Sequence, residues 1–226
     1  MTTVSPAITC SDLAVGYDRP VLEGIDLSVD PGETLALVGP SGAGKTTFLR
    51  TLAGIHEPLA GHGSVLEARL PDSPPPGELG YIPQRLGLLS HATVRQSVLH
   101  GRLPGLGPVR SLLGRFPHDD REAADQAIAD VGLAGLADRR VATLSGGQQR
   151  RVAIARALVQ EPTILLADEL LSELDPETAE RIVDRVERLQ DRTDAAVVIV
   201  EHDHSMAERV ADRVLEVADG VVRDRR

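Results

Sequence analysis

The apolar positions of the chain follow two patterns, and each pattern predicts a class of element. Near the N-terminus, apolar and polar residues alternate between turn residues, which indicates half-buried strands. Further along, short continuous apolar runs are typical of strands that are covered on both faces. The predicted strands cover 8–14, 20–23, 25–29, 35–38, 79–82, 163–167 and 195–200, followed by a hairpin over 214–223.

Helical spacing of apolar residues fills the intervals between the later strands. Predicted helices cover 46–53, 148–159, 178–189 and 205–211, of which 178–189 is strongly amphipathic. Between residues 90 and 141 the helical spacing is broken by loops that contain Gly and Pro, which predicts an all-helical insertion. Its apolar stretch at 110–117 would either pack inside the insertion or form part of a docking surface. Alternating strands and helices predict an α/β fold with a mostly parallel sheet, preceded by an antiparallel β-subdomain.

Length, charge and cysteine content narrow the classes of function. A chain of 226 residues is long enough for one core with an attached subdomain. The net charge of −10 argues against a general nucleic-acid-binding surface, so we expect no nucleic-acid partner. Cys10 is the single cysteine, which fits a reducing compartment. No apolar run approaches the ~18 residues of a membrane span, and the N-terminus does not have the pattern of a signal peptide.

Residues 39–46 form the pattern G-x-x-x-x-G-K-[ST], which is typical of a phosphate-binding loop. An apolar run precedes it and a predicted helix follows it, as the pattern requires. Glycines let successive backbone N–H groups point at one anion, and the helix start adds positive potential. Lys45, the only lysine in the chain, can supply a charge for the β- and γ-phosphates, and Thr46 a hydroxyl for Mg²⁺.

Two acidic residues follow the apolar run 163–167, at the end of a strand where ligands bind in open α/β sheets. Asp168 is placed to help hold Mg²⁺, directly or through water. Glu169 points elsewhere and can orient and polarise an attacking water. Such a pair alone is often a solvated acidic turn, but together with the phosphate loop it predicts hydrolysis of a nucleotide.

The segment Leu144-Ser145-Gly146-Gly147-Gln148 precedes another predicted helix. Ser145 can cap that helix, which is the simplest interpretation. Two glycines and a serine at a helix start also form an anion-binding end. The single γ-phosphate of a nucleotide already has a binding loop, so the segment is best explained by a dimer in which it faces the nucleotide of the other copy.

These motifs and their order resemble the nucleotide-binding domain of the ABC (ATP-binding cassette) ATPases, over nearly the whole chain. Residues 144–148 match the signature motif of that family, which is far more specific than a phosphate loop. The resemblance implies a P-loop NTPase-type fold in one domain over 1–226. Within it, 1–89 and 142–226 would form a RecA-like core with a β-subdomain, and 90–141 a helical subdomain. The implied cofactors are ATP and Mg²⁺.

The resemblance also implies catalytic roles for Glu169 and His202, the latter as the switch histidine on the γ-phosphate. His204 is a competing candidate, but His202 directly follows a strand as the family requires. Tyr17 would stack on adenine, although the residues alone leave open an ordinary, partly buried loop ring. The implied metal-site residues are Thr46, Gln84 and Asp168. The implied nucleotide-binding residues are Tyr17, Gly39, Pro40, Ser41, Gly42, Ala43, Gly44, Lys45, Thr46, Thr47, Gln84, Ser145, Gly146, Gly147, Gln148 and Asp175.

The chain departs from the family pattern at two places. Leu170-Leu171 follows Glu169 where the family usually has Pro-Thr, and Arg150 stands where Gln is common. Because Glu169 is retained, we expect catalysis to survive, with a D-loop at 172–175 whose path can differ.

The insertion is most similar to that of the phosphonate-import ATPases, through 93–103 and 111–117, while zinc and manganese importers share part of the similarity. The resemblance implies a pair of subunits, expected to be a homodimer, at the cytoplasmic face of the cell membrane. Transmembrane permease subunits and a solute-binding protein would be its partners. An exporter or membrane-complex ATPase shares the same motifs. Soluble ABC proteins of DNA repair or translation usually carry long coiled-coil insertions or tandem cassettes, which this chain lacks.

Overall fold

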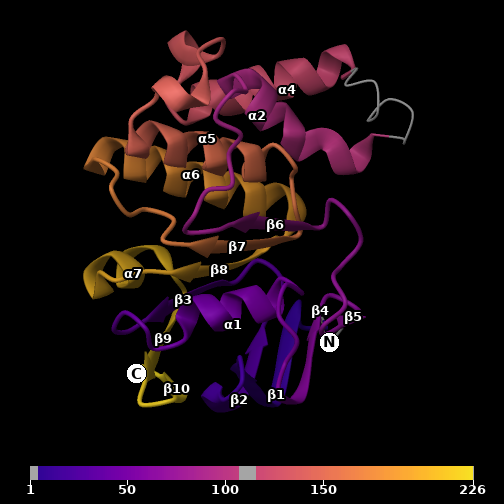
Figure 1. Ribbon diagram of the computed structural model, residues 1–226, viewed down its shortest axis with the longest axis vertical. Helices are drawn as coiled ribbons and strands as arrows, with labels where there is room; N and C mark the ends of the chain where they lie inside the picture. Colours follow the sequence, from indigo (N-terminus) through magenta and orange to yellow (C-terminus); the bar gives the residue numbers. More distant parts are fainter. Residues whose placement is uncertain (1–4, 107–115, 226) are drawn as a thin grey trace.

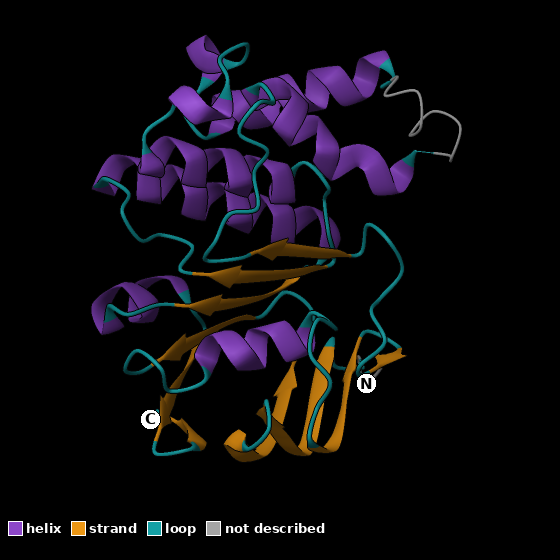
Figure 2. Cartoon of the chain, viewed as in Figure 1, coloured by secondary structure: helices purple, strands orange, loops and turns teal. Residues whose placement is uncertain are grey.

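The computed structural model describes residues 5–106 and 116–225 and arranges them in layers (Figures 1 and 2). A six-stranded sheet lies in the middle of the molecule. A group of helices covers one face of this sheet, and helix α1 with a second, four-stranded sheet covers the other. Among the described residues, no helix combines the length and apolar character needed to cross a membrane.

The N-terminal sheet is antiparallel, as predicted, with the strand order β2-β1-β4-β5. Two separate strands were predicted on either side of Gly24, and this is wrong, because one continuous strand spans the region. It pairs with β1 on both sides of Gly24 through register shifts, and Gly24 takes a φ of +61°, which suits a bulge. The strands are β1 (Ile8–Gly16), β2 (Pro20–Val29), β4 (Ala60–Val65) and β5 (Ala68–Arg69).

The six-stranded sheet has the order β10-β9-β3-β8-β7-β6 and is parallel except for the terminal hairpin. Every residue of β3, β7 and β8 is buried, which is why these strands are continuously apolar except for Thr34 at the start of β3 and Asp168 at the end of β7. Because they run parallel, their carboxyl ends meet at one edge of the sheet. The strands are β3 (Thr34–Val38), β6 (Leu79–Ile82), β7 (Ile164–Asp168), β8 (Ala196–Val200), β9 (Arg213–Ala218) and β10 (Val221–Asp224).

The helices lie on both faces of this sheet. Helix α1 (Lys45–Leu52) packs between the two sheets and buries Phe48 completely. Helices α5 (Gly146–Leu158) and α6 (Pro176–Thr193) lie on the opposite face, and α7 (His204–Val210) precedes β9. Helix α6 begins before the predicted range because Asp175 caps it and Pro176 opens it, and it extends beyond that range to Thr193, where Asp194 in a left-handed conformation ends it.

The predicted helical insertion is confirmed over the described residues. It contains α2 (Val94–Leu99) and α4 (His118–Asp130), with short 3₁₀ turns at His100–Gly105, Ala134–Leu136 and Val141–Thr143. Most of the apolar stretch at 110–117 falls outside the described residues.

Buried apolar side chains form two clusters that β7 separates. Leu165 and Ala167 face a cluster shared with α2, α4, α5 and α6, while Ile164 and Leu166 face α1 and the N-terminal sheet. The helical insertion therefore shares a continuous core with the six-stranded sheet.

Candidate nucleotide-hydrolysis site

The phosphate loop connects β3 to α1 in a backbone conformation that requires glycine. Gly44 has a φ of +103°, and a side chain there would approach Val21 Cγ1 to 2.8 Å. Gly39 has a φ of +146°, and a side chain there would lie 2.1 Å from the carbonyl oxygen of Val217. Larger residues are therefore excluded at both positions, and the loop keeps the tight curvature that turns its N–H groups inward.

Lys45 is buried at the base of this loop. Its Nζ donates to the carbonyl oxygens of Gly39 at 2.6 Å and Pro40 at 2.9 Å. Burial lowers the pKa of Lys45, and the charges of Asp168 and Glu169 act in the opposite direction. The ammonium thus sits between the loop and the acidic end of β7, where it is available to an anion in the loop.

Asp168 ends β7 and is almost completely buried. Burial raises the pKa of Asp168, and a hydrogen bond with Thr46 opposes this effect. Within the described part of the chain, its Oδ2 has no hydrogen-bond partner. A buried, unpartnered carboxylate oxygen beside a hydroxyl is the donor set that a hard cation prefers. The residues present therefore fit Mg²⁺ bound with a nucleotide.

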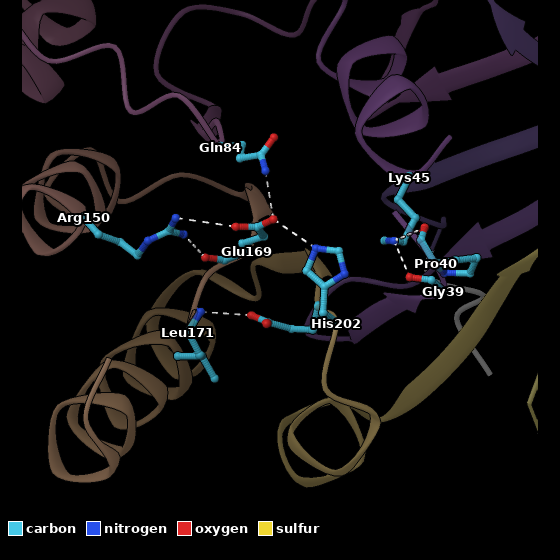
Figure 3. A network of polar contacts seen from close by, with 9 residues as sticks. Gly39, Pro40, Lys45, Gln84, Arg150, Glu169, Leu171 and His202 are labelled. Atoms are coloured by element: carbon cyan, nitrogen blue, oxygen red, sulfur yellow. Dashed lines mark hydrogen bonds and ion pairs between the residues drawn. The ribbon is translucent and has the colours of Figure 1, made fainter. Parts of the chain in front are cut away.

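Glu169 lies at the centre of a polar network drawn in Figure 3. Its Oε1 accepts a hydrogen bond from Gln84 Nε2 at 3.0 Å and lies 3.0 Å from Nε2 of His202. These residues come from three separate segments that follow β6, β7 and β8. The sequence predicted each of them, and the parallel sheet brings them to one carboxylate.

A cleft of about 240 Å³ connects the loop with this network. Tyr17 is 56% exposed at its margin, with its ring edge-to-face against His56 at a centroid distance of 5.1 Å. Val21 and Val200 also line the cleft, and the sequence did not predict them because apolar residues in strands indicate only burial. The predicted residues that line the cleft are Tyr17, Ser41, Gly42, Ala43, Gly44, Lys45, Thr46, Thr47, Gln84, Asp168, Glu169 and His202.

The remaining predicted residues lie outside this cleft. Ser145 caps α5 by accepting a hydrogen bond from the N–H of Gln148, and the side-chain Oε1 of Gln148 accepts one from the N–H of Ser145. Asp175 caps α6 in a similar way, and its bond from the Thr178 hydroxyl lowers its pKa. Ser145, Gly146, Gly147, Gln148 and Asp175 therefore do not complete the cleft of their own chain.

Comparison with known proteins identifies the family of the chain. The profile of the ABC transporter family matches residues 22–172. The chain belongs to this family. The resemblance drawn from the motifs is thereby confirmed, as are ATP and Mg²⁺ as the cofactors and ATP hydrolysis as the activity of an ABC cassette.

Relatives match the cassette over most of its length. It is 43% identical to the phosphonates import ATP-binding protein PhnC 1 of Natronomonas pharaonis, over 94% of this chain and 90% of that protein. It is 36% identical to PhnC of Maricaulis maris, over 100% and 93%. It is also 37% identical to the Fe(3+) ions import ATP-binding protein FbpC of Rhizobium etli, over 98% of this chain and 62% of that protein.

Solved structures confirm the predicted fold of the cassette. A dimeric bacterial ABC transporter cassette superimposes with a TM-score of 0.85 at 27% identity, over 97% of this chain and 98% of that one. A dimeric cassette in a post-hydrolysis state, bound to ADP and Pi, superimposes with a TM-score of 0.84 at 28% identity, over the same shares.

Proposed function

We propose that this cassette powers an importer and that the residues around Glu169 carry out the hydrolysis of ATP. The main observation that supports this proposal is the position of the Glu169 carboxylate. It stands at the cleft beside the phosphate loop, with Gln84 and His202 each 3.0 Å from the same oxygen. A carboxylate held in this way can accept the proton of a water that attacks the γ-phosphate.

The other cleft residues have roles that follow from their chemistry. Lys45 exchanges its bonds to the loop carbonyls for bonds to the β- and γ-phosphates, and the loop N–H groups bind the remaining phosphate oxygens. His202 donates to the γ-phosphate, and Tyr17 offers its exposed ring face to the adenine. Thr46, Asp168 and Gln84 would hold Mg²⁺, which would supply positive charge to offset the charge that develops on the phosphate oxygens.

A second copy of the chain completes the site in this proposal. Ser145, Gly147 and the start of α5 of one copy would face the γ-phosphate that the other copy binds, and Asp175 would lie at the same interface. The position of these residues outside their own cleft supports this arrangement, as does the likeness to a dimeric cassette. We propose a homodimer of single-domain cassettes, each with its helical subdomain at 90–141.

The partners of the pair would be transmembrane permease subunits, which place the cassette at the cytoplasmic face of the membrane. The names of the relatives at 36% and 43% identity support import of a phosphonate-like anion, with a solute-binding protein as a further partner. A relative named for import of Fe(3+) ions is 37% identical, so the cassette sequence alone carries little information about cargo. Cargo-stimulated ATP hydrolysis in vesicles with the co-purified permease tests this part of the proposal.

The replacement Glu169→Gln tests the assigned base. The amide keeps the shape of the side chain but accepts no proton, so the variant should bind ATP, accumulate as an ATP-bound dimer and lose turnover. The exposed Glu187 on α6 provides a matched control, and Glu187→Gln should behave as the wild type. Phosphate release near the wild-type rate in Glu169→Gln would show that the base has been assigned wrongly.

A further inference from the structure

Arg150 is a buried cation that has no role in the proposed binding and hydrolysis of ATP. It lies on α5 and is 6% exposed, although an arginine is rarely buried without an acidic partner. Its closest acidic partner is Glu169: Nη2 lies 3.6 Å from Oε2, and Nη1 donates to the backbone carbonyl of the same residue. Figure 3 shows the guanidinium reaching both groups from one side.

The two oxygens of Glu169 have different neighbours. Oε1 is shared by Gln84 and His202 on the cleft side, while Oε2 faces Arg150 on the side of α5. The carboxylate is therefore held at both ends, and its rotation about the last side-chain bond is restricted. A planar guanidinium suits this contact, because it presents several N–H groups in a fixed fork.

The backbone of Glu169 also needs support. Its φ of +63° lies in the left-handed region, which a residue with a long side chain adopts at an energetic cost. Its N–H donates to the carbonyl of Val200 at 2.9 Å, and its carbonyl accepts from Arg150. The turn is thus fixed from the neighbouring strand on one side and from α5 on the other.

Glu201 holds the next part of the same turn. It is 3% exposed, and its Oε1 accepts a hydrogen bond from the N–H of Leu171 at 2.9 Å. Burial raises the pKa of Glu201, and the Leu171 hydrogen bond and the charge of Arg150 oppose that effect. Arg150 and Glu201 are therefore electrostatic neighbours that hold the turn from 169 to 171, where the chain departs from the family pattern.

We propose that Arg150 is a positioning residue for Glu169: it fixes the carbonyl and Oε2 so that Oε1 stays directed into the cleft. The proposal rests on the proposed function, in which Glu169 is the catalytic base. Arg150 contacts Glu169 from the side of α5 and does not itself line the cleft that would bind ATP. Its loss should therefore lower the rate of hydrolysis and leave nucleotide affinity unchanged.

The experiment compares Arg150→Met and Arg150→Lys with the wild type as full-length purified chains. Methionine retains much of the apolar stem but donates no hydrogen bond, and we expect kcat to fall about ten- to a hundredfold, with the Kd for ATP within twofold of the wild type. Lysine restores one charged donor but cannot form the fork, so Arg150→Lys should recover part of kcat.

A second arginine, largely covered by its surroundings, provides the matched control. Arg185 on α6 pairs with Asp130 at 2.9 Å, away from the cleft, and its side chain is 13% exposed. Arg185→Met should lower the thermal midpoint, because it leaves the partly buried Asp130 without its partner, and it should leave kcat unchanged. A fall in kcat of the same size in Arg185→Met would mean that Arg150 has only a structural role and would overturn the proposal.

The double variant Arg150→Met with Glu169→Gln separates positioning from general destabilisation. If Arg150 acts through Glu169, the double variant should have the residual turnover of Glu169→Gln alone. A further loss, or a loss of ATP binding in Arg150→Met, would overturn the proposal. Failure of both Arg150→Met and Arg150→Lys to fold would also overturn it, since the residue would then be a structural requirement.

The failure of this inference can be distinguished from the failure of the proposed function. Wild-type kcat in Arg150→Met, with Glu169→Gln inactive, would reject the positioning role and leave the base assignment intact. Near-wild-type turnover in Glu169→Gln would instead reject the base assignment itself.

Discussion

Nε2 of His202 lies 3.0 Å from Oε1 of Glu169, although 33 positions separate the two residues in the chain. Each follows a buried strand, β8 and β7 respectively, and these strands are neighbours in the parallel sheet. The side chain of the proposed switch histidine is therefore in direct contact with the carboxylate of the proposed base.

We expect His202→Ala to lower kcat about a hundred- to a thousandfold, because a donor aimed at developing charge is removed from the site. The affinity for ATP should change only a few-fold, since the phosphate loop is intact. His204 is the matched control: it is two positions further on and its Nδ1 contacts Arg225 instead of the cleft. Steady-state phosphate release from both variants tests this, and an equal loss in His204→Ala would contradict the assignment.

Ser145→Ala should have two effects that can be measured separately. Loss of the cap on α5 should destabilise the fold by about 1 kcal/mol, as measured by urea unfolding. Because Ser145 is proposed to meet the nucleotide of the second copy, the same change in a Glu169→Gln background should also abolish ATP-dependent dimerisation, measured by size-exclusion chromatography.

Thr93 offers a control with the same local chemistry. It caps α2 in a capping box with Gln96, just as Ser145 pairs with Gln148 on α5. Thr93→Ala in the Glu169→Gln background should lose similar stability and still dimerise with ATP. Dimerisation that survives in the Ser145 variant as well would argue against the proposed interface.

Cys10 should make stability depend on pH in the alkaline range. Burial raises the pKa of the thiol from 9.0 to about 12, so the unfolded chain releases this proton at a lower pH than the folded chain does. The stability that the neutral thiol contributes is complete below pH 9 and is lost as the pH rises towards 12. Between pH 8 and pH 10 the wild type should lose about 1.4 kcal/mol more unfolding free energy than Cys10→Ala.

Reactivity gives a second measurement of the same prediction. Native protein at pH 8 should resist a thiol-alkylating reagent, and urea-unfolded protein should react quickly, because the thiolate is the reactive form. Rapid labelling of the native chain, or parallel pH profiles of the wild type and Cys10→Ala, would contradict the buried, neutral thiol.

Phe48→Ala should destabilise the fold by about 3–5 kcal/mol, because it removes a fully buried ring from α1 between the two sheets. The chain's other phenylalanine, Phe116, is only partly buried against the helical cluster, so Phe116→Ala should cost clearly less. Urea unfolding of both variants measures the difference in unfolding free energy. Similar losses of stability in the two variants would contradict the prediction that Phe48 contributes more to the core than Phe116 does.

The sequence by itself determined the class of fold and most of the site, because these depend on local patterns. A phosphate loop needs glycines and Lys45 within eight consecutive positions, and a buried strand that ends in Asp168-Glu169 needs only a short apolar run before two acids. Such signals are contained in single segments. The division of β2 was predicted wrongly for the complementary reason: Gly24 is a turn signal locally, and pairing with β1 overrides it.

Only the tertiary structure decided which side chains meet. Gln84 and His202 share one oxygen of Glu169 because the parallel order of β6, β7 and β8 places the ends of these strands at one edge. In the sequence, Arg150 was visible only as a residue that replaces the common Gln of the family, and no partner for it could be named. The packing of α5 on the sheet brings it to Glu169. Contacts of this kind depend on helix packing and strand order, which no local pattern of residues encodes.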